Sequence, residues 1–183
     1  MMTGQASRFW MFSLAVYANA AVRAECLDLQ DRYGIDLNLL LFCAYIGAVH
    51  AVVLPPSAME EAAGLVADWH GNIVRSLRTA RRALKPFAAS ETPLANPAAE
   101  LRCSVNTAEL DAERLEQMML EAWSAPLVGG WPRAELEAAV AANIRALFRA
   151  GNGPTRLAGL PLRLIAAARS ASAASFPRPP ALT

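Results

Sequence analysis

Polar side chains that could bind a ligand gather at one predicted turn between two helices. Gln30 and Asp31 lie at the end of the first helix, and Asp36 and Asn38 lie at the start of the second. Helix capping explains Asp36 fully and Asn38 in part, but it gives Gln30 and Asp31 no role. Polar groups beside a core helix need hydrogen-bond partners. We therefore predict a hydrogen-bonded structural turn here, with a ligand site as the alternative.

Two further predicted helices carry faces of opposite charge. The basic face consists of Arg75, Arg78, Arg82 and Lys85, and the acidic face consists of Glu109, Glu113 and Glu116. The apolar faces opposite them consist of Trp69, Ile73, Leu77, Ala80 and Leu84, and of Ala112, Leu115, Met118, Met119 and Ala122. Charged faces are usually solvated, and a surface for an oppositely charged partner is the alternative. If the faces meet water, or each other within one chain, reversing the charge of Arg78 should change stability by less than about 1 kcal/mol.

Motifs for catalysis, cofactor binding and metal binding are missing from the sequence. It contains no Gly-x-Gly-x-x-Gly, Walker, Gly-x-Ser-x-Gly or His-Glu-x-x-His motif, and its two histidines exclude a histidine-rich metal site. The three carboxylates of the acidic face could bind a hard metal ion, but carboxylate metal bundles usually add a Glu-x-x-His motif. Cys43 and His50 lie about 10 Å apart along one helix, too far for a catalytic thiolate–imidazole pair. We therefore predict no metal and no cofactor.

Composition favours one helical globular domain. The chain has 183 residues, of which 55% are hydrophobic, enough to bury a core. Ala and Leu dominate the apolar residues, which favours helices over strands. The net charge of +1 creates no strong field for nucleic acid or an anionic membrane, so no nucleic-acid partner is predicted.

The cysteines and the N-terminus indicate a reducing cytoplasm. Cys26, Cys43 and Cys103 are odd in number and widely spaced, which indicates neither a disulfide framework nor a zinc site. Each is expected on an apolar face, where a free cysteine packs as a small hydrophobe. The segment 8–22 loosely resembles a signal peptide, but polar residues interrupt it and its pattern continues into the next helix. We therefore expect no secretion.

Apolar spacing and chain breakers predict an all-α fold with no strand. The expected helices span 8–18, 20–33, 37–53, 57–85, 107–123, 132–151 and 161–171. Ser7 and Asp36 are expected N-caps, and Gly34 is an expected left-handed C-cap. Ser57 and Glu60 have the spacing of a capping box.

The prolines and the two ends of the chain delimit one predicted domain at 7–171. Residues 1–6 are expected to form a flexible leader, and the proline-rich segment 86–99 a linker between the halves of the fold. Pro132 is expected in the first turn of its helix. The low-complexity tail, 172–183, is expected to be disordered.

The helix expected at 37–53 is apolar all round except for Asn38 and His50. Such a helix is either the central helix of a bundle or a membrane span. Its uninterrupted apolar run, 39–49, has 11 residues, whereas a span needs about 20. We therefore predict that it is the central helix of a compact bundle of about six to seven helices, with no membrane span.

Four strings resemble a family of uncharacterised bacterial proteins of proteobacterial type, a domain of unknown function. They are Phe9-Trp10-x-Phe12-Ser13-Leu14-x-x-Tyr17; Cys26-Leu27-x-Leu29-Gln30-Asp31-x-x-Gly34-x-Asp36-Leu37-Asn38-Leu39-Leu40-Leu41-Phe42; Trp69 through Leu77-Arg78, with Arg81-Arg82 and Leu84-Lys85; and Glu109-Leu110-x-Ala112-Glu113. The similarity covers about 7–125 and departs at Tyr45, His70 and Ser76, where the family has Trp, Arg and Pro. It implies a helical cytoplasmic protein and supplies no activity. It also argues against secretion, because the first helix belongs to the family domain.

Two functions are compatible with these features. The first is a small cytoplasmic helical interaction protein that binds a protein partner or itself, which the two complementary charged faces favour. The alternative is a small-molecule-binding protein or enzyme whose pocket is lined by Trp10, Gln30, Asp31, Asp36 and Asn38. Apolar pockets with a few convergent polar groups are the usual ligand sites of helical bundles. A cavity at the turn would favour the alternative, and a solid core there would favour the first.

Overall fold

The computed structural model describes residues 7–150 and 160–175. The α-helices are α1 (Arg8–Tyr17), α2 (Ala20–Tyr33), α3 (Leu37–His50), α4 (Pro56–Trp69), α5 (Arg75–Ala83), α6 (Lys85–Ala88), α7 (Ala95–Ser124), α8 (Leu136–Ala150) and α9 (Leu162–Ser175). A π-helix, η1 (His70–Val74), joins α4 to α5, and a 3₁₀-helix, η2 (Val128–Gly130), follows α7. The described residues contain no strand beyond one isolated bridge between Val52 and Arg133, so the predicted all-α class is confirmed.

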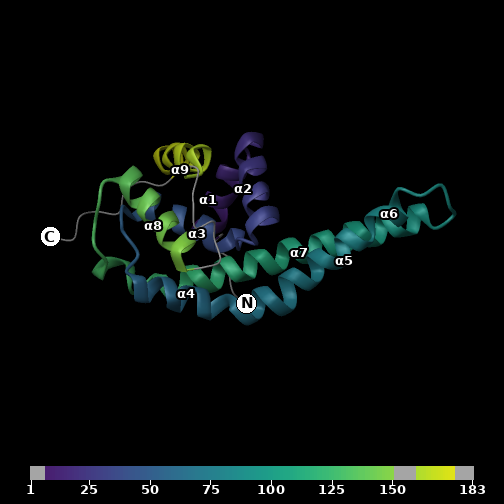
Figure 1. Ribbon diagram of the computed structural model, residues 1–183, viewed down its shortest axis with the longest axis horizontal. Helices are drawn as coiled ribbons and strands as arrows, with labels where there is room; N and C mark the ends of the chain where they lie inside the picture. The colour runs from purple at the N-terminus through teal and green to yellow at the C-terminus, as the bar shows by residue number, and fades with distance from the viewer. Residues whose placement is uncertain (1–6, 151–159, 176–183) are drawn as a thin grey trace.

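Helix α3 is the centre of a compact body (Figure 1). All of its residues from Asn38 to Val49 are buried, as the apolar pattern predicted. Helices α1, α7, α8 and α9 all pack against it. Asp36 caps its N-terminus, and Gly34 ends α2 in the left-handed conformation with a φ of 66°. Both local signals therefore act as predicted.

The closest helix crossing in the body is between α3 and α8. A Cβ atom placed on Gly47 would lie 2.6 Å from the backbone nitrogen and Cα of Val140, so only glycine allows this approach. Buried Asn143 of α8 then bonds the chain that leaves α3. Its Oδ1 accepts from the Leu54 backbone N–H at 2.8 Å, and its Nδ2 donates to the Val52 carbonyl at 3.0 Å. These bonds satisfy backbone groups where the central helix ends.

A helical arm projects from the body (Figure 1). It comprises residues 75–111, in which α5 and α6 lie against the N-terminal part of α7. The predicted linker at 86–99 is wrong, because it contains part of α6, the turn of the hairpin and the start of α7. Helix α7 begins at Ala95, well before the predicted start at 107. Pro97 lies in its first turn, where a missing backbone N–H loses no helical hydrogen bond.

Two predicted helix starts are also wrong. The N-cap of α4 is Pro55, with Pro56 at the first helical position and no side-chain cap, so Ser57 and Glu60 form no capping box. Pro132 lies before α8, and its carbonyl accepts from the Val53 N–H at 2.8 Å. The side chain of Glu135 instead accepts from the backbone N–H groups of residues 137 and 138, at the start of α8.

The helix ends differ from the predictions at two places. Helix α3 ends at His50 because Ala51 takes a left-handed conformation, with a φ of 55°. Helix α9 continues to Ser175, and the Ser172 hydroxyl donates to the Ala48 carbonyl at 2.7 Å. The prediction of a disordered tail is therefore wrong for residues 172–175, which are helical. The rest of the predicted tail, 176–183, lies outside the described residues. So do the predicted leader at 1–6 and the helix end predicted near Gly151.

The cysteines differ in burial. Cys26 and Cys43 are buried, whereas Cys103 is exposed on the arm. The prediction that all three lie on apolar inner faces is therefore wrong for Cys103, because its helix is covered on one side only. Within residues 7–150 and 160–175, no helix combines the length and the apolar character needed to cross a membrane.

The α3–α8 crossing generates a prediction about two glycines. Gly47→Ala should destabilise the protein by about 1–3 kcal/mol or more, because the new methyl group meets backbone that cannot move away freely. Gly64→Ala, at an exposed position of α4 with open space around the new Cβ, should stabilise it by up to about 1 kcal/mol through helix propensity. Urea unfolding of both variants measures the difference. If Gly47→Ala and Gly64→Ala were equally stable, the backbones of α3 and α8 would not be in close contact at Gly47.

Candidate functional site

The turn between α2 and α3 lies where the body meets the arm. Asp36 in this turn has two separate roles, one for each carboxylate oxygen. Its Oδ1 accepts from the backbone N–H groups of Asn38 and Leu39 at 2.8 and 3.3 Å, which is the predicted cap. Its Oδ2 lies 3.1 Å from Nδ1 of His70. The cap therefore orients the carboxylate toward a residue distant in the sequence.

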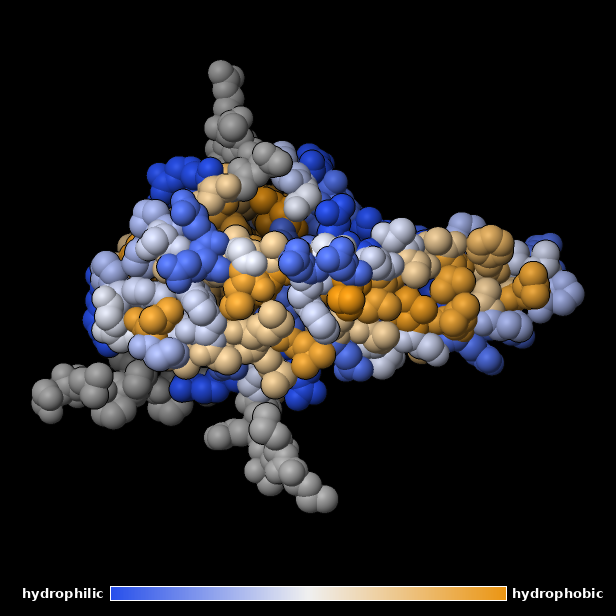
Figure 2. All heavy atoms as spheres, turned by 90° about the horizontal axis from the view of Figure 1, so that it is seen from below, coloured by the Kyte–Doolittle hydropathy of each residue, from blue (hydrophilic) through white to orange (hydrophobic). Residues whose placement is uncertain are grey.

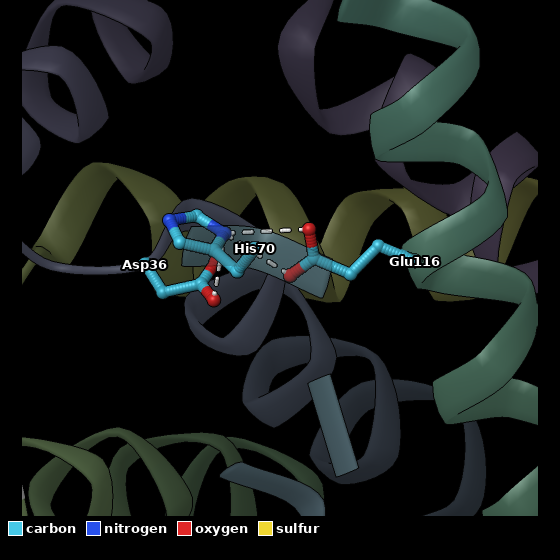
Figure 3. A group of neighbouring side chains, drawn as sticks. All are labelled: Asp36, His70 and Glu116. Carbon is cyan, nitrogen blue, oxygen red and sulfur yellow. Dashed lines mark hydrogen bonds and ion pairs between the residues drawn. The ribbon is translucent and has the colours of Figure 1, made fainter. Parts of the chain in front are cut away.

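Asp36, His70 and Glu116 form a cluster, called here the His70 cluster (Figure 3). Nδ1 of His70 lies 3.3 Å from both carboxylate oxygens of Glu116, in addition to its contact with Asp36. The three residues come from the turn before α3, from η1 and from α7. Two carboxylates therefore converge on a single imidazole nitrogen.

The π-helix η1 places His70 in this cluster. His70 is its first residue, and the chain continues as α-helix on both sides. The indole N–H of the preceding residue, Trp69, donates to the Ala112 carbonyl at 3.0 Å, which fixes η1 against α7 one turn from Glu116. A π-turn within an α-helix is rare and often accompanies a functional site.

Burial makes the electrostatics of the His70 cluster unusual. Glu116 is fully buried, and only 15% of the Asp36 and His70 side chains is exposed. Burial and the negative charge of Glu116 raise the pKa of Asp36 to about 7. Burial lowers the pKa of His70, but its hydrogen bond to Glu116 and the two carboxylate charges outweigh burial and raise it overall. The cluster thus favours holding a positive charge or a proton between the carboxylates.

Sequence reasoning missed this cluster. It assigned Asp36 to capping and to the candidate ligand pocket, placed Glu116 on the acidic face and gave His70 no role. The wrong prediction of a linker at 86–99 left out the antiparallel hairpin of α5 and α7. Only that hairpin places Glu116 next to η1. The signal that could have indicated the cluster is an acidic residue of α7 that faces inward, next to Trp69 and His70.

The acidic face of α7 points into the structure. Arg78 contacts Glu109 at 3.1 Å and Glu113 at 2.7 Å, and Arg81 contacts Glu109 at 2.5 Å. Burial raises the pKa of Glu109, but the bonds to Arg81 and Arg78 outweigh it and lower that pKa overall. The acidic face is therefore not solvated, and the expectation that the two charged faces meet within one chain holds for Arg78, because partly buried ion pairs join α5 to α7.

The remaining residues of the basic face stay at the surface. Arg82 pairs with Asp31 at 2.7 Å, with 56% of each side chain exposed, and Arg75 and Lys85 are exposed. The predicted apolar face of α7 is partly outward, since Leu115 and Met118 are exposed. This face of α7 is exposed to water, and the ion-paired glutamates lie on the covered face.

Two cavities adjoin the α2–α3 turn, and they divide the five predicted ligand residues between them. The Trp10 cavity, about 230 Å³, is lined by Trp10, Gln30 and Asn38 and by apolar residues that include Leu14, Leu27, Leu41 and Leu110. The His70 cavity, about 400 Å³, is lined by Gln30, Asp31, Asp36 and His70, with Arg75 among its other residues. Gln30 alone of the five lines both.

Asn38 belongs to a buried hydrogen-bond chain between helices. The Ser13 hydroxyl donates to Oε1 of Gln117 at 2.9 Å, and Nε2 of Gln117 donates to Oδ1 of Asn38 at 2.9 Å. The chain links α1, α7 and α3, so Asn38 has a packing role beside the cavity. In contrast, Nε2 of Gln30 is buried and makes no hydrogen bond within the described part of the chain.

The buried and exposed arginines of the arm should differ in their effect on stability. Arg78→Ala should cost about 1–3 kcal/mol, because it leaves the partly buried Glu113 without its ion-pair partner, whereas Glu109 keeps Arg81. This loss of stability is larger than the change of less than about 1 kcal/mol predicted from the sequence for reversing the charge of Arg78. Arg82→Ala removes an exposed pair with Asp31 and should cost less than about 1 kcal/mol. Chemical denaturation compares the two variants, and similar losses would contradict the buried pairing.

Comparison with known proteins identifies one family. The family described as "Protein of unknown function (DUF2390)" matches residues 8–120. No curated protein and no solved structure matches the chain.

Proposed function

Because the chain belongs to the family of proteins of unknown function DUF2390, its activity has to be argued from its own site, and we propose that it binds a small molecule in the Trp10 cavity. The observation that supports this most is that Gln30 lines the cavity while its buried Nε2 has no hydrogen-bond partner within the described residues. A buried donor without a partner destabilises a fold by about 1–3 kcal/mol. A bound acceptor would remove that cost.

The lining of the Trp10 cavity favours an apolar ligand with one hydrogen-bond acceptor. Leucines from α1, α2, α3 and α7 meet the Trp10 side chain there. Its polar groups are mostly committed, since Asn38 and Gln117 bond each other and Arg78 and Glu109 form an ion pair. Gln30 is left to select the ligand. Asp31 and Asp36, predicted for the same pocket, line the His70 cavity and have no part in this proposal.

Gln30→Leu tests the proposal. The substitution removes the unpaired donor and keeps the volume of the side chain, so the melting temperature should hold or rise. The variant should also lose the small molecules that wild type retains when it is purified from native lysate, as measured by mass spectrometry after denaturation. Asp31→Ala is the matched control, because Asp31 is the next residue and lies outside the Trp10 cavity.

Either of two results would contradict ligand binding through Gln30. A lower melting temperature in Gln30→Leu would give the amide a structural role. Identical small-molecule contents in wild type and variant would place any ligand elsewhere.

A second candidate function, protein–protein contact, is supported by the surface of the arm. Figure 2 shows apolar side chains gathered along it. Phe87, Leu94 and Leu101 are each more than half exposed there, and contiguous exposed apolar surface commonly marks an interaction site. The acidic face, which together with the basic face first suggested association, pairs with Arg78 and Arg81 within the chain, so we place the contact on these apolar residues. A second copy is the partner to measure first.

Sedimentation of Leu101→Asp tests this second candidate. If the arm mediates self-association, wild type should show a concentration-dependent mass that Leu101→Asp abolishes. Leu162→Asp, at an exposed position of α9 on the body, should leave it unchanged. Apolar contacts should persist as salt rises, whereas an electrostatic dimer would dissociate. A wild-type monomer at every concentration would contradict self-association.

We also propose that the protein is bacterial and cytoplasmic and that nucleic acid is not among its partners. The family resemblance supports the first part. The free cysteines support a reducing compartment. Pairing of Arg78 and Arg81 with glutamates supports the last part, because it leaves fewer cations to contact phosphates.

A further inference from the structure

We propose that the His70 cluster is a binding site for a divalent transition-metal ion, held by Asp36, His70 and Glu116. Zn²⁺ is the ion best matched to the donors. The proposal runs against the expectation of no metal site that the sequence motifs supported. It is independent of ligand binding in the Trp10 cavity, because none of the three residues lines that cavity.

The spacing of the donor atoms fits a metal ion. One ligand atom from each residue lies within 4.8 Å of the other two. Nδ1 of His70 is 3.1 Å from Oδ2 of Asp36 and 3.3 Å from Oε1 of Glu116. Bond lengths of about 2.0–2.2 Å in a tetrahedral zinc site separate neighbouring donors by about 3.4 Å. The two distances from Nδ1 would have to lengthen by only a few tenths of an ångström to match that separation.

The charge of the cluster calls for a cation. Glu116 is fully buried, yet no arginine or lysine of the described chain forms an ion pair with Glu116 or Asp36. The nearby guanidinium groups of Arg78 and Arg81 are bonded to Glu109 and Glu113. Two carboxylates therefore share one imidazole. A buried carboxylate needs a cation or a proton, and a divalent ion would neutralise both carboxylates at once.

The donor types and their surroundings select the class of metal. An imidazole nitrogen beside two carboxylates suits Zn²⁺ or a neighbouring transition metal, whereas Ca²⁺ and Mg²⁺ prefer six or more oxygen ligands. The backbone N–H groups of Asn38 and Leu39 hold the other oxygen of Asp36, which orients this ligand as outer-shell partners do. The His70 cavity adjoins Asp36 and His70. It leaves the fourth position open to water or a substrate, as in catalytic zinc sites.

Calorimetry of the full-length, tag-free chain with Zn²⁺ after dialysis against a chelator tests the site. Wild type should bind one Zn²⁺ per chain, and Zn²⁺ should raise its melting temperature. Glu116→Gln removes one ligand together with a buried charge, so the metal-free variant should remain folded. Its affinity for Zn²⁺ should fall by about 100-fold or more, and so should that of His70→Gln.

Two control variants cover the competing ligands, and a second measurement identifies the donors. His50→Asn alters the only other histidine in the sequence, and Cys103→Ser removes the exposed thiol. Both should bind Zn²⁺ as wild type does. Co²⁺ substituted for Zn²⁺ should give visible d–d absorption without a thiolate charge-transfer band, since no cysteine belongs to the cluster.

Two results would overturn the metal site. Folded wild type that fails to bind Zn²⁺ would show that a proton alone bridges the carboxylates. Equal Zn²⁺ affinity in wild type, Glu116→Gln and His70→Gln would place the ion elsewhere. Either result leaves the Gln30 experiment interpretable, because that experiment measures small molecules and different residues.

Discussion

One polar face of α7 holds the separate parts of this protein together. Its four glutamates and Gln117 between them contact α5, η1, α3 and the start of α1. Glu109 and Glu113 bind the arginines of α5, Glu116 binds His70 of η1, and Gln117 binds Asn38 of α3. Farther along, Glu121 accepts from the Ser7 hydroxyl at 2.5 Å and from the Phe9 backbone at 3.2 Å, which fixes the start of α1.

This arrangement constrains the fold because each buried acid of α7 needs its partner. An unpaired buried charge is far more destabilising than the pair is stabilising. The helices that contact α7 therefore have little freedom to shift along it without losing several partners together. The apolar core around α3 supplies the bulk of the burial, and the face of α7 sets the register of the elements around that core.

The cavities lie where two modes of packing meet. In the body, apolar surfaces pack against each other. Helix α3 approaches α8 so closely that only glycine fits at position 47. In the arm, guanidinium and carboxylate groups join the helices. The Trp10 cavity is bounded by both kinds of side chain. Charged groups engaged in fixed pairs cannot move to fill apolar space, so space remains at the junction. Candidate ligand sites arise there for that physical reason.

Local signals in the sequence determined the first three helices and the central position of α3. Caps and left-handed glycines act within a few residues, so Ser7, Gly34 and Asp36 could be assigned without the rest of the chain. The all-round apolar pattern of α3 required burial. Gln30 could likewise be singled out as a polar residue that capping did not explain.

The tertiary structure alone decided which face of α7 points inward. Periodicity shows that a helix has an acidic face and an apolar face, and the usual rule buries the apolar one. In this chain the arginines of α5 reverse the rule over the length of the arm, and they act through contacts between residues far apart in the sequence. The His70 cluster depends on the same packing, because Asp36, His70 and Glu116 come together only when the acidic face of α7 lies against η1. No local pattern encodes that meeting, since each of the three residues has an ordinary explanation within its own helix.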